Sequence, residues 1–218
     1  TLNLTSGAAS KICDFPNNEE FTSLYIPSPE VKEAAPAKVQ EINPVFTNGN
    51  LSGKLIVKAP ELTFSGLKLS GKVTLKVDVD GAEKYSAEVN AGQSVEIPLT
   101  LTEGTHSFAA TAENASGAGP RTGVAAYVGI DAPAQPGNVA IATDDKGRAI
   151  ITWTAPTAGR HGGYIDPTRI TYNVTRMPDG AQVATGIATT SAVDPLEVDA
   201  SNYYYMVTPF IDQREGLS

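Results

Sequence analysis

Apolar and polar residues alternate along most of the chain with a period of two. The clearest stretch is residues 72–79, KVTLKVDV, in which valine or leucine occupies every second position. Successive side chains of a strand point to opposite faces of a sheet, so this pattern predicts a half-buried β-strand. The same alternation predicts strands within residues 95–101, 108–112 and 122–130. No window of 11 or more residues has a convincing helical period, and we therefore predict an all-β protein.

Turn residues divide these segments into strands of the length that a β-sandwich uses. Asp80-Gly81 stands between two alternating runs and predicts a tight hairpin. In the second half of the chain, the apolar positions predicted to face a core are Ala149, Ile151, Trp153, Ile170, Tyr172, Val174, Tyr203, Tyr205 and Val207. Strands of five to nine residues separated by Gly, Pro, Asn and Asp are typical of β-sandwiches.

The chain contains two copies of one unit of about 97 residues. Landmarks recur 97, 96 and 97 positions apart: Pro36 and Pro133, Pro60 and Pro156, His106 and Tyr203. A constant offset of this kind indicates a tandem repeat. We therefore predict two tandem sandwiches, residues 36–131 and residues 132–218.

Residues 1–35 fit neither copy of the repeat. They contain one strand-like run, Phe21 to Ile26, and then several prolines that favour extended backbone. Two interpretations stay open for this extended segment: the last strand of a preceding module with its linker, or an N-terminal extension.

The residues of the second unit resemble the fibronectin type III module. The stretches GRAIITWTAP, ITYNVTR and YYYMVTPFIDQREGLS carry the resemblance, and the positions that match are Trp153, Tyr172, Tyr203, Tyr205, Gly216 and Ser218. The resemblance implies an immunoglobulin-like fold in which Tyr203 forms a tyrosine corner, its hydroxyl bonded back to the backbone. The first unit departs from the pattern, with Val57 at the position of the tryptophan and His106 at that of the corner tyrosine.

The matching of the two units also leads to an expectation about the last strand. In the first unit, residues 108–114 are followed by the closing strand within 122–130, whereas the matching residues 203–210 are followed by only eight more. We therefore expect the second sandwich to lack its last strand. In the first unit, the stretches APAKVQEINP and GKLIVKAPELTFSGLKLSGKVTLKVDVDG are similar to repeats of exported multidomain proteins of Bacteroidetes. This resemblance implies an extracellular or cell-surface location.

Charge and cysteine content exclude several classes of partner. The formal net charge is −8 and there is no Lys/Arg cluster, so we expect neither nucleic acid nor an anionic membrane surface as a partner. No run of about 18 apolar residues is present, so we expect no membrane insertion. Cys13 is the single cysteine, which excludes an intrachain disulfide.

The sequence indicates no catalytic residue, metal site or cofactor, and we predict that the chain is not an enzyme. There are two histidines; His106 falls on an inward strand position and is predicted to be a hydrogen-bonded core residue. Asp131 lies at the junction of the units without a second carboxylate cluster near it in the sequence, so a calcium site there is not indicated.

The candidates for ligand binding are a loop and some isolated tyrosines. Arg160, His161 and Tyr164 lie in a Gly-rich loop between two predicted strands, and loops carry binding residues on rigid sandwiches. Tyr204 is predicted to face away from the core on its strand, and Tyr85 is a further candidate for an exposed aromatic ring.

Three functions are compatible with these features. The first is a non-catalytic structural or adhesive module pair that spaces or presents other domains of the same polypeptide and contacts protein or polysaccharide ligands. The second is a carbohydrate-binding module that uses the exposed tyrosines. The third is a pilin-like subunit assembled by donor-strand exchange, in which another chain supplies a strand.

Overall fold

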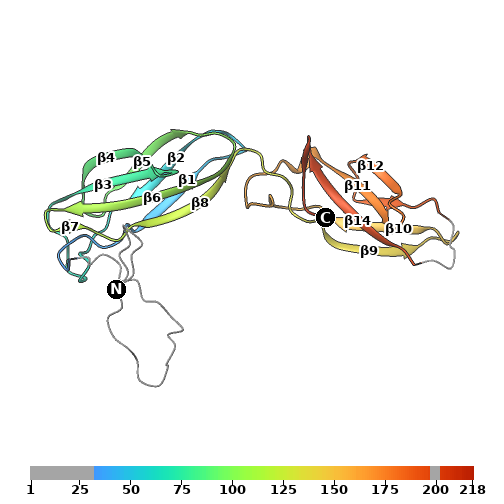
Figure 1. Ribbon diagram of the computed structural model, residues 1–218, viewed down its shortest axis with the longest axis horizontal. Helices are drawn as coiled ribbons and strands as arrows, with labels where there is room; N and C mark the ends of the chain where they lie inside the picture. Colours follow the sequence, from blue (N-terminus) through green and yellow to red (C-terminus); the bar gives the residue numbers. More distant parts are fainter. Residues whose placement is uncertain (1–31, 197–201) are drawn as a thin grey trace, which may run out of the picture. The chain divides into compact units, whose positions relative to one another are not determined.

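The computed structural model describes residues 32–196 and 202–218, and these residues form two β-sandwiches that follow one another along the chain (Figure 1). The described residues fall within one compact unit, Val31–Ser218. The prediction of an all-β fold is confirmed, since the one helical element among the described residues is a short 3₁₀ turn, η2 (Pro167–Arg169). The predicted strand-like run Phe21–Ile26 and Cys13 lie outside the described residues.

The first sandwich packs a three-stranded sheet against a larger second sheet. The three-stranded sheet has the order β1-β2-β5, and the second has the order β4-β3-β6, with both β7 and β8 paired to β6. The strands are β1 (Glu41–Val45), β2 (Ser52–Lys58), β3 (Lys72–Val79), β4 (Ala82–Asn90), β5 (Ser94–Thr100), β6 (Gly104–Asn114), β7 (Gly117–Ala118) and β8 (Thr122–Val128). All pairings in both sheets are antiparallel.

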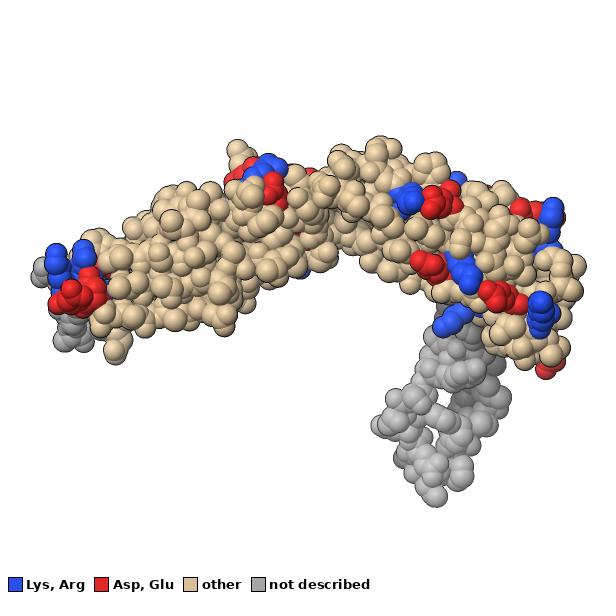
Figure 2. All heavy atoms as spheres, turned by 180° about the vertical axis from the view of Figure 1, so that it is seen from behind, with Lys and Arg blue, Asp and Glu red and all other residues tan. Residues whose placement is uncertain are grey.

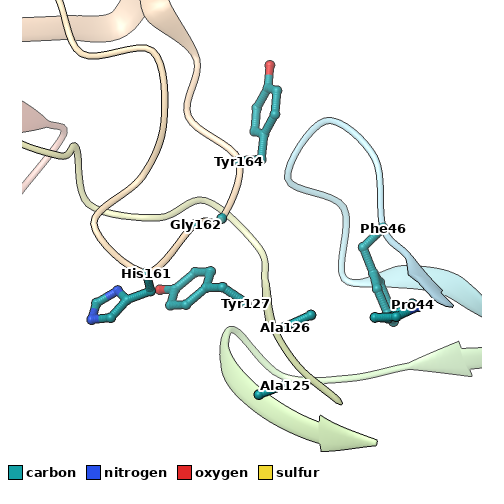
Figure 3. Close-up of a pocket in the computed structure, with 9 residues that line it drawn as sticks. Pro44, Phe46, Ala125, Ala126, Tyr127, His161, Gly162 and Tyr164 are labelled. Carbon is teal, nitrogen blue, oxygen red and sulfur yellow. The ribbon is translucent and has the colours of Figure 1, made fainter. Parts of the chain in front are cut away.

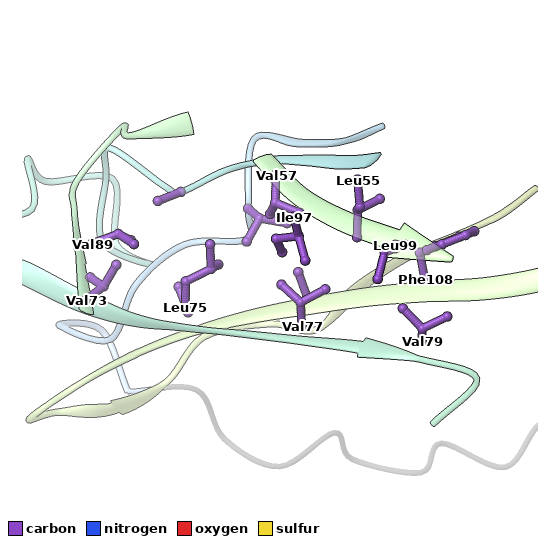
Figure 4. Close-up of a cluster of buried hydrophobic side chains, with 14 of the residues drawn as sticks. Leu55, Val57, Val73, Leu75, Val77, Val79, Val89, Ile97, Leu99 and Phe108 are labelled. Carbon is purple, nitrogen blue, oxygen red and sulfur yellow. The ribbon is translucent and has the colours of Figure 1, made fainter. Parts of the chain in front are cut away.

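The alternating pattern of the sequence produces the core of this sandwich. On β3 every second residue is buried, and the lysines and threonine between them face outward. Figure 4 shows buried side chains of both sheets pointing into the space between them. Fully buried members include Leu55, Val57, Leu75, Val77 and Phe108. Removing a buried aromatic ring such as Phe108 would cost about 3–5 kcal/mol of stability.

The predicted hairpin at Asp80-Gly81 is confirmed. Val79 pairs with Ala82, and both turn residues have positive φ, 52° for Asp80 and 78° for Gly81. Two positive φ values in succession make a type I′ turn, whose twist matches that of the flanking strands. Gly81 is suited to this conformation because it lacks a Cβ.

The turn also supplies the acceptor for His106, which is buried as the sequence predicts. The imidazole Nδ1 lies 2.6 Å from Oδ2 of Asp80, and Nε2 lies 2.9 Å from the carbonyl oxygen of Thr102. Both partners accept, so the ring bonds best as the doubly protonated cation. Burial by itself lowers the pKa of His106, but the bonds to Asp80 and Thr102 outweigh it and leave the pKa raised above 6.5. The bond from His106 lowers the pKa of the Asp80 carboxyl in turn.

Strands β9–β15 of the second sandwich repeat the order of β1–β7 of the first. One sheet has the order β13-β10-β9 and the other β12-β11-β14-β15. The strands are β9 (Gly137–Thr143), β10 (Ala149–Thr154), β11 (Ile170–Met177), β12 (Gln182–Ile187), β13 (Ser191–Val193), β14 (Tyr204–Ile211) and β15 (Arg214–Glu215). Among the described residues, β15 pairs with β14 at two positions, Phe210↔Glu215 and Ile211↔Arg214. We predicted from the sequence that the second sandwich lacks its last strand, the one that would follow β15, and this stays a prediction.

Eight of the nine positions predicted to face inward in the second sandwich form its core or pack against it, and Tyr203 is the exception. Ile151, Trp153, Ile170, Tyr172, Val174 and Val207 are buried, and Ala149 and Tyr205 pack against them half-buried. The Trp153 and Tyr172 rings meet edge to face, with centroids 5.2 Å apart. The indole therefore lies in the core, as the resemblance implies, and Val57 fills the matching position of the first sandwich with no exposed surface.

A buried charge network holds one side of the second sandwich. The carboxylate of Asp194, 1% exposed, accepts bonds from the Arg176 guanidinium at 2.8 and 2.9 Å and from the Tyr205 hydroxyl at 2.9 Å. Burial and the bond to Asp194 raise the pKa of Tyr205 to about 12. The guanidinium of Arg176 also lies 5.0 Å from the centre of the Tyr203 ring. The hydroxyl bond of the tyrosine corner implied for Tyr203 stays a prediction.

We expect His106→Leu to lower the free energy of unfolding by about 1–3 kcal/mol at pH 6, because it removes the His106 donor from the Thr102 carbonyl and from Oδ2 of Asp80, whose Oδ1 still accepts from Ser107. The pKa of His106 is raised in the folded state, so the contribution of these bonds is fully present below about pH 6.5 and is lost as the pH rises through the raised value. Urea denaturation of both proteins at pH 6 and pH 9 should show a smaller difference at pH 9.

Asp80→Asn is the matched control, because asparagine tolerates positive φ but carries no charge. In this background the effect of His106→Leu should depend much less on pH. An effect of equal size at both pH values would contradict the assigned cation.

Candidate functional site

The segment between β8 and β9 carries a fully buried carboxylate, Asp131. Its Oδ2 accepts hydrogen bonds from the backbone amides of His161 and Gly163, at 2.8 and 3.0 Å. Its Oδ1 lies 2.8 Å from Nδ1 of the His161 ring. A carboxylate only accepts, so Nδ1 carries the proton and Nε2 is directed elsewhere. Three donors thus satisfy a charge that would otherwise be costly to bury.

The loop that surrounds Asp131 needs its glycines. A Cβ on Gly159 would lie 2.2 Å from Oδ2 of Asp131, and a Cβ on Gly163 would lie 2.9 Å from the Asp131 Cβ. Gly162 has φ of 78°, a left-handed conformation that glycine adopts without strain. The glycines of this loop therefore allow its backbone to approach the Asp131 carboxylate closely.

Backbone bonds join this loop to the segment that leads into the second sandwich. The amide of Asp131 donates to the carbonyl of Tyr164 at 2.8 Å, and the amide of Arg160 donates to the carbonyl of Ala132 at 2.8 Å. Pro133 and Gly159 form an antiparallel bridge. The junction segment is therefore paired on both sides of Asp131.

The first sandwich reaches the same loop through Tyr127, near the end of β8. The Tyr127 and His161 rings stack with centroids 5.3 Å apart and an interplanar angle of 7°. Burial raises the pKa of Tyr127, and the negative charges of Glu103 and Asp131 raise it further, so the phenol stays neutral. Since Asp131 fixes one edge of the His161 ring, it also fixes the ring against Tyr127.

An ion pair lies beside this stack. The guanidinium of Arg214, on β15, contacts the carboxylate of Glu103 through Nε at 3.0 Å and through Nη2 at 2.9 and 2.8 Å. Both side chains are about one third exposed, so solvent screens the pair. The bidentate geometry nevertheless fixes orientation better than a single contact does.

A cavity of about 390 Å³ opens beside the loop. Its lining residues are Pro44, Phe46, Ala125, Ala126, Tyr127, His161, Gly162, Gly163 and Tyr164. Figure 3 shows the Tyr127 and His161 rings beside one another, Phe46 and Pro44 on the other side of the cavity, and Tyr164 projecting from the loop. Aromatic rings around a concave space are common in ligand sites.

The structure brings together two of the five predicted binding residues. His161 and Tyr164 both line the cavity, and Tyr164 is 37% exposed. Arg160 is exposed in the same loop but does not line the cavity. Tyr204 is 56% exposed on β14, and Tyr85 is half-buried on β4, where it packs against the first core. Neither of these two tyrosines lines the cavity.

Sequence reasoning missed two residues of this site. The sequence indicates no role for Asp131, whose carboxylate accepts from the amides of His161 and Gly163, 30 and 32 residues further on. Tyr127 lies in an alternating strand and has no local feature that marks it as a stacking residue. Comparison of the two copies of the repeat gives one indication of the site, a carboxylate in place of an apolar residue. Asp131 stands where the first copy has Ala34, 97 positions earlier.

The interactions of the site are hydrogen bonds and ring contacts. In the part of the chain that the structure describes, the His161 ring is bonded to Asp131 and to no hydroxyl or thiol that it could activate. No group of three or more His, Cys, Asp or Glu side chains that could hold a metal ion occurs among the described residues. Those same residues contain no helix that is long and apolar enough to span a bilayer.

On the face shown in Figure 2, Lys and Arg side chains lie close to Asp and Glu side chains in small groups. Ion pairs such as Lys54–Glu96 at 2.8 Å and Lys76–Glu113 at 2.7 Å join neighbouring strands. No extended patch of one charge is seen among the coloured residues of that face.

No family model matches the chain, and no curated protein matches it. Among solved structures, the chain is similar to the crystal structure of the FN1–FN3 domains of chicken CNTN1. The two share 16% identity with a TM-score of 0.34, and the match covers 83% of this chain and 63% of that one. The chain therefore spans less than two thirds of the length of that structure. Strand order and pairing define the class: two tandem β-sandwiches of the immunoglobulin and fibronectin type III kind.

We expect Gly163→Ala to displace the loop, because the added Cβ would lie 2.6 Å from Cδ1 of Tyr127. The free energy of unfolding should fall by about 1–3 kcal/mol, the usual cost of overpacking. The NMR shifts of the His161 ring protons, which the current of the Tyr127 ring displaces, should move toward those of a free histidine. Gly162→Asn is the control, since a Cβ there meets nothing within 4 Å and asparagine tolerates positive φ. Unaltered ring shifts in Gly163→Ala would refute the stack.

Proposed function

We propose that the chain is a non-catalytic pair of β-sandwich modules that spaces and presents neighbouring domains of the same polypeptide. The observation that supports this role most directly is the buried Asp131 carboxylate with its three donors. A spacer must limit the freedom of its joint, and Asp131 ties the joint segment to loop 159–163. The Tyr127–His161 stack and the Glu103–Arg214 pair act on the same joint.

The cellular setting is part of this proposal. An exported, cell-surface protein of a bacterium suits tandem sandwiches of this kind, and the resemblance of the first unit to exported Bacteroidetes repeats supports it. The absence of an activated nucleophile beside His161, within the described residues, supports a role without catalysis.

The test is an Asp131→Ala variant studied by NMR. In the parent, ¹⁵N relaxation should give the two sandwiches the same rotational correlation time, and in the variant two different times. The amides of His161 and Gly163 lose their acceptor, so their hydrogen exchange should be at least about tenfold faster, corresponding to roughly 1.4 kcal/mol.

The matched control is Asp145→Ala, which removes the same charge from an exposed position in the turn between β9 and β10. It should leave both the correlation times and the two exchange rates unchanged. If the sandwiches of the parent already tumble with different correlation times, the spacer role is wrong.

The cavity favours a second candidate, the recognition of carbohydrate. Aromatic faces stack against the C–H groups of sugar rings, and Tyr164 is both exposed and part of the cavity wall. The hydroxyl of Tyr127, a neutral phenol whose pKa burial raises further, would add a hydrogen-bonding group. The ligand would then be an oligosaccharide contacted by the faces of Tyr164 and Tyr127.

A glycan array followed by calorimetry tests this candidate. Tyr164→Ala should weaken the binding of any glycan found by at least about tenfold, since one stacked ring is worth about 1.5 kcal/mol. Tyr204→Ala also removes an exposed tyrosine, but one that does not line the cavity, and should bind like the parent. An array without signal above background would eliminate this function.

A further inference from the structure

The edge of β14 that faces away from β11 is open over most of its length, within the residues that the structure describes. β14 pairs with β11 from Tyr204 to Ile211, but β15 covers the other edge only at Phe210 and Ile211. In the first sandwich the matching strand, β6, pairs with β8 on that side from Gly104 to Ala110. Unpaired N–H and C=O groups along a strand edge can pair with another strand.

Two apolar side chains on the facing sheet are exposed although they point to the core side. Ile141 of β9 lies opposite the buried Ile151, and Val139 lies two positions before it, so both point inward. They are 53% and 45% exposed. The matching residues of the first sandwich, Ile42 and Pro44, are half-buried, because β8 contacts β1 as well as β6. Among the described residues, the second sandwich has no counterpart of β8.

We call these two side chains of β9, together with residues 204–208 of β14, the open seam. The first sandwich shows what covers such a seam, namely an antiparallel strand with the sequence of β8. The run Phe21–Ile26, which lies outside the described residues, is similar to that strand. Its Leu24-Tyr25-Ile26 matches Ala126-Tyr127-Val128 in kind and order: an apolar residue, a tyrosine and a β-branched residue.

The register of β8 on β6 predicts how this run would lie in the open seam. Ala126 pairs with the buried His106, so Leu24 at the matching position would point inward, to the side where the β9 side chains are exposed. The same register places Phe21 opposite Met206, whose side chain is 39% exposed. A thioether beside an aromatic ring is a favourable contact.

The run cannot reach the open seam of its own chain. The Asn114 amide donates to the carbonyl of Ala34 at 2.9 Å, so the N-terminal segment joins the first sandwich at that end of β6. The joint to the second sandwich leaves from the opposite end, where Val128 pairs with Gly104. β6 has 11 residues and is therefore about 35 Å long. The chain from Ile26 to Ala34 spans at most about 28 Å.

We infer that the open seam accepts the run Phe21–Ile26 of a second copy of this chain as a closing β-strand. In strand addition of this kind, main-chain hydrogen bonds provide the affinity and alternate side chains fix the register. Donor and acceptor are different surfaces, so each copy can donate one strand and accept another. Such a heterologous contact gives head-to-tail assemblies rather than a symmetric dimer. The inference goes beyond the spacer function and does not depend on it.

Sedimentation of the full chain over a range of concentrations tests this inference, with Cys13→Ser in every sample to prevent disulfide-linked dimers. The parent should form species heavier than the single chain of 22.8 kDa, in a proportion that grows with concentration. Ser23→Pro/Leu24→Pro should associate at least about tenfold more weakly, because one of two successive N–H groups must face the seam. Ala8→Pro/Ala9→Pro, in the same segment but outside the run, is the matched control and should associate like the parent.

A second variant blocks the acceptor instead of the donor. Residues 122–130, which contain β8, are appended directly after Ser218, where the offset of 97 places them. The appended strand should fill the open seam of its own chain, so this variant should not associate with itself. It keeps its donor run, and Ser23→Pro/Leu24→Pro keeps its open seam. An equimolar mixture of the two should therefore form a dimer with one chain of each.

A parent that stays monomeric up to about 1 mM would overturn the inference. Association that Ser23→Pro/Leu24→Pro leaves unchanged would do the same, because another surface would then join the copies. So would a mixture of the two variants that stays monomeric, since the appended variant needs only its N-terminal run to donate. The relaxation experiment on Asp131→Ala can be carried out in the Ser23→Pro/Leu24→Pro background, so the spacer function is tested separately from assembly.

Discussion

One buried charge determines how the chain passes from its first core to its second. A carboxylate without solvent contact is tolerated only when its lone pairs are bonded, and Asp131 meets this condition with donors from a single loop. The need to satisfy Asp131 constrains both the loop and the joint segment. The loop must bring its backbone within reach, which selects glycine at 159 and 163, and the joint segment must stay paired to the loop to keep Asp131 satisfied.

The two sandwiches share a backbone plan and differ in the chemistry of the same positions. His106 stands at the position of a tyrosine in the fibronectin type III pattern. Its ring bonds to the carbonyl of Thr102, four residues earlier, and to Asp80 as a second acceptor. Ala34 stands where the second copy has Asp131. Matching positions of the two sandwiches can therefore carry apolar, polar or charged side chains, because the main-chain hydrogen bonds hold the strands in order independently of those side chains.

The strands and both cores could be predicted from the sequence, since period-two alternation directly reflects which face of a strand is buried. The turn at Asp80-Gly81 was predictable for a local reason too, the need for positive φ. Asp131 was not, because its role depends on amides 30 residues away that carry no side-chain signature. The stack of Tyr127 on His161 could not be predicted either, because the two residues are far apart in the sequence. The half-burial of Tyr85 reflects packing against the core rather than its position in the alternating pattern.

The shared loop frame has a consequence for protein engineering. In both copies, amide–carbonyl bonds to the Ala-Pro-Ala segment hold one loop, residues 62–67 in the first copy and 158–163 in the second. These bonds involve no side chain. The identities of Phe64 in one copy and of Arg160 in the other can therefore vary while the backbone keeps its course, whereas His161 is constrained by the bond from its ring to Asp131. Such positions are suited to randomised libraries, because a change of side chain there leaves the main-chain bonds of the loop in place.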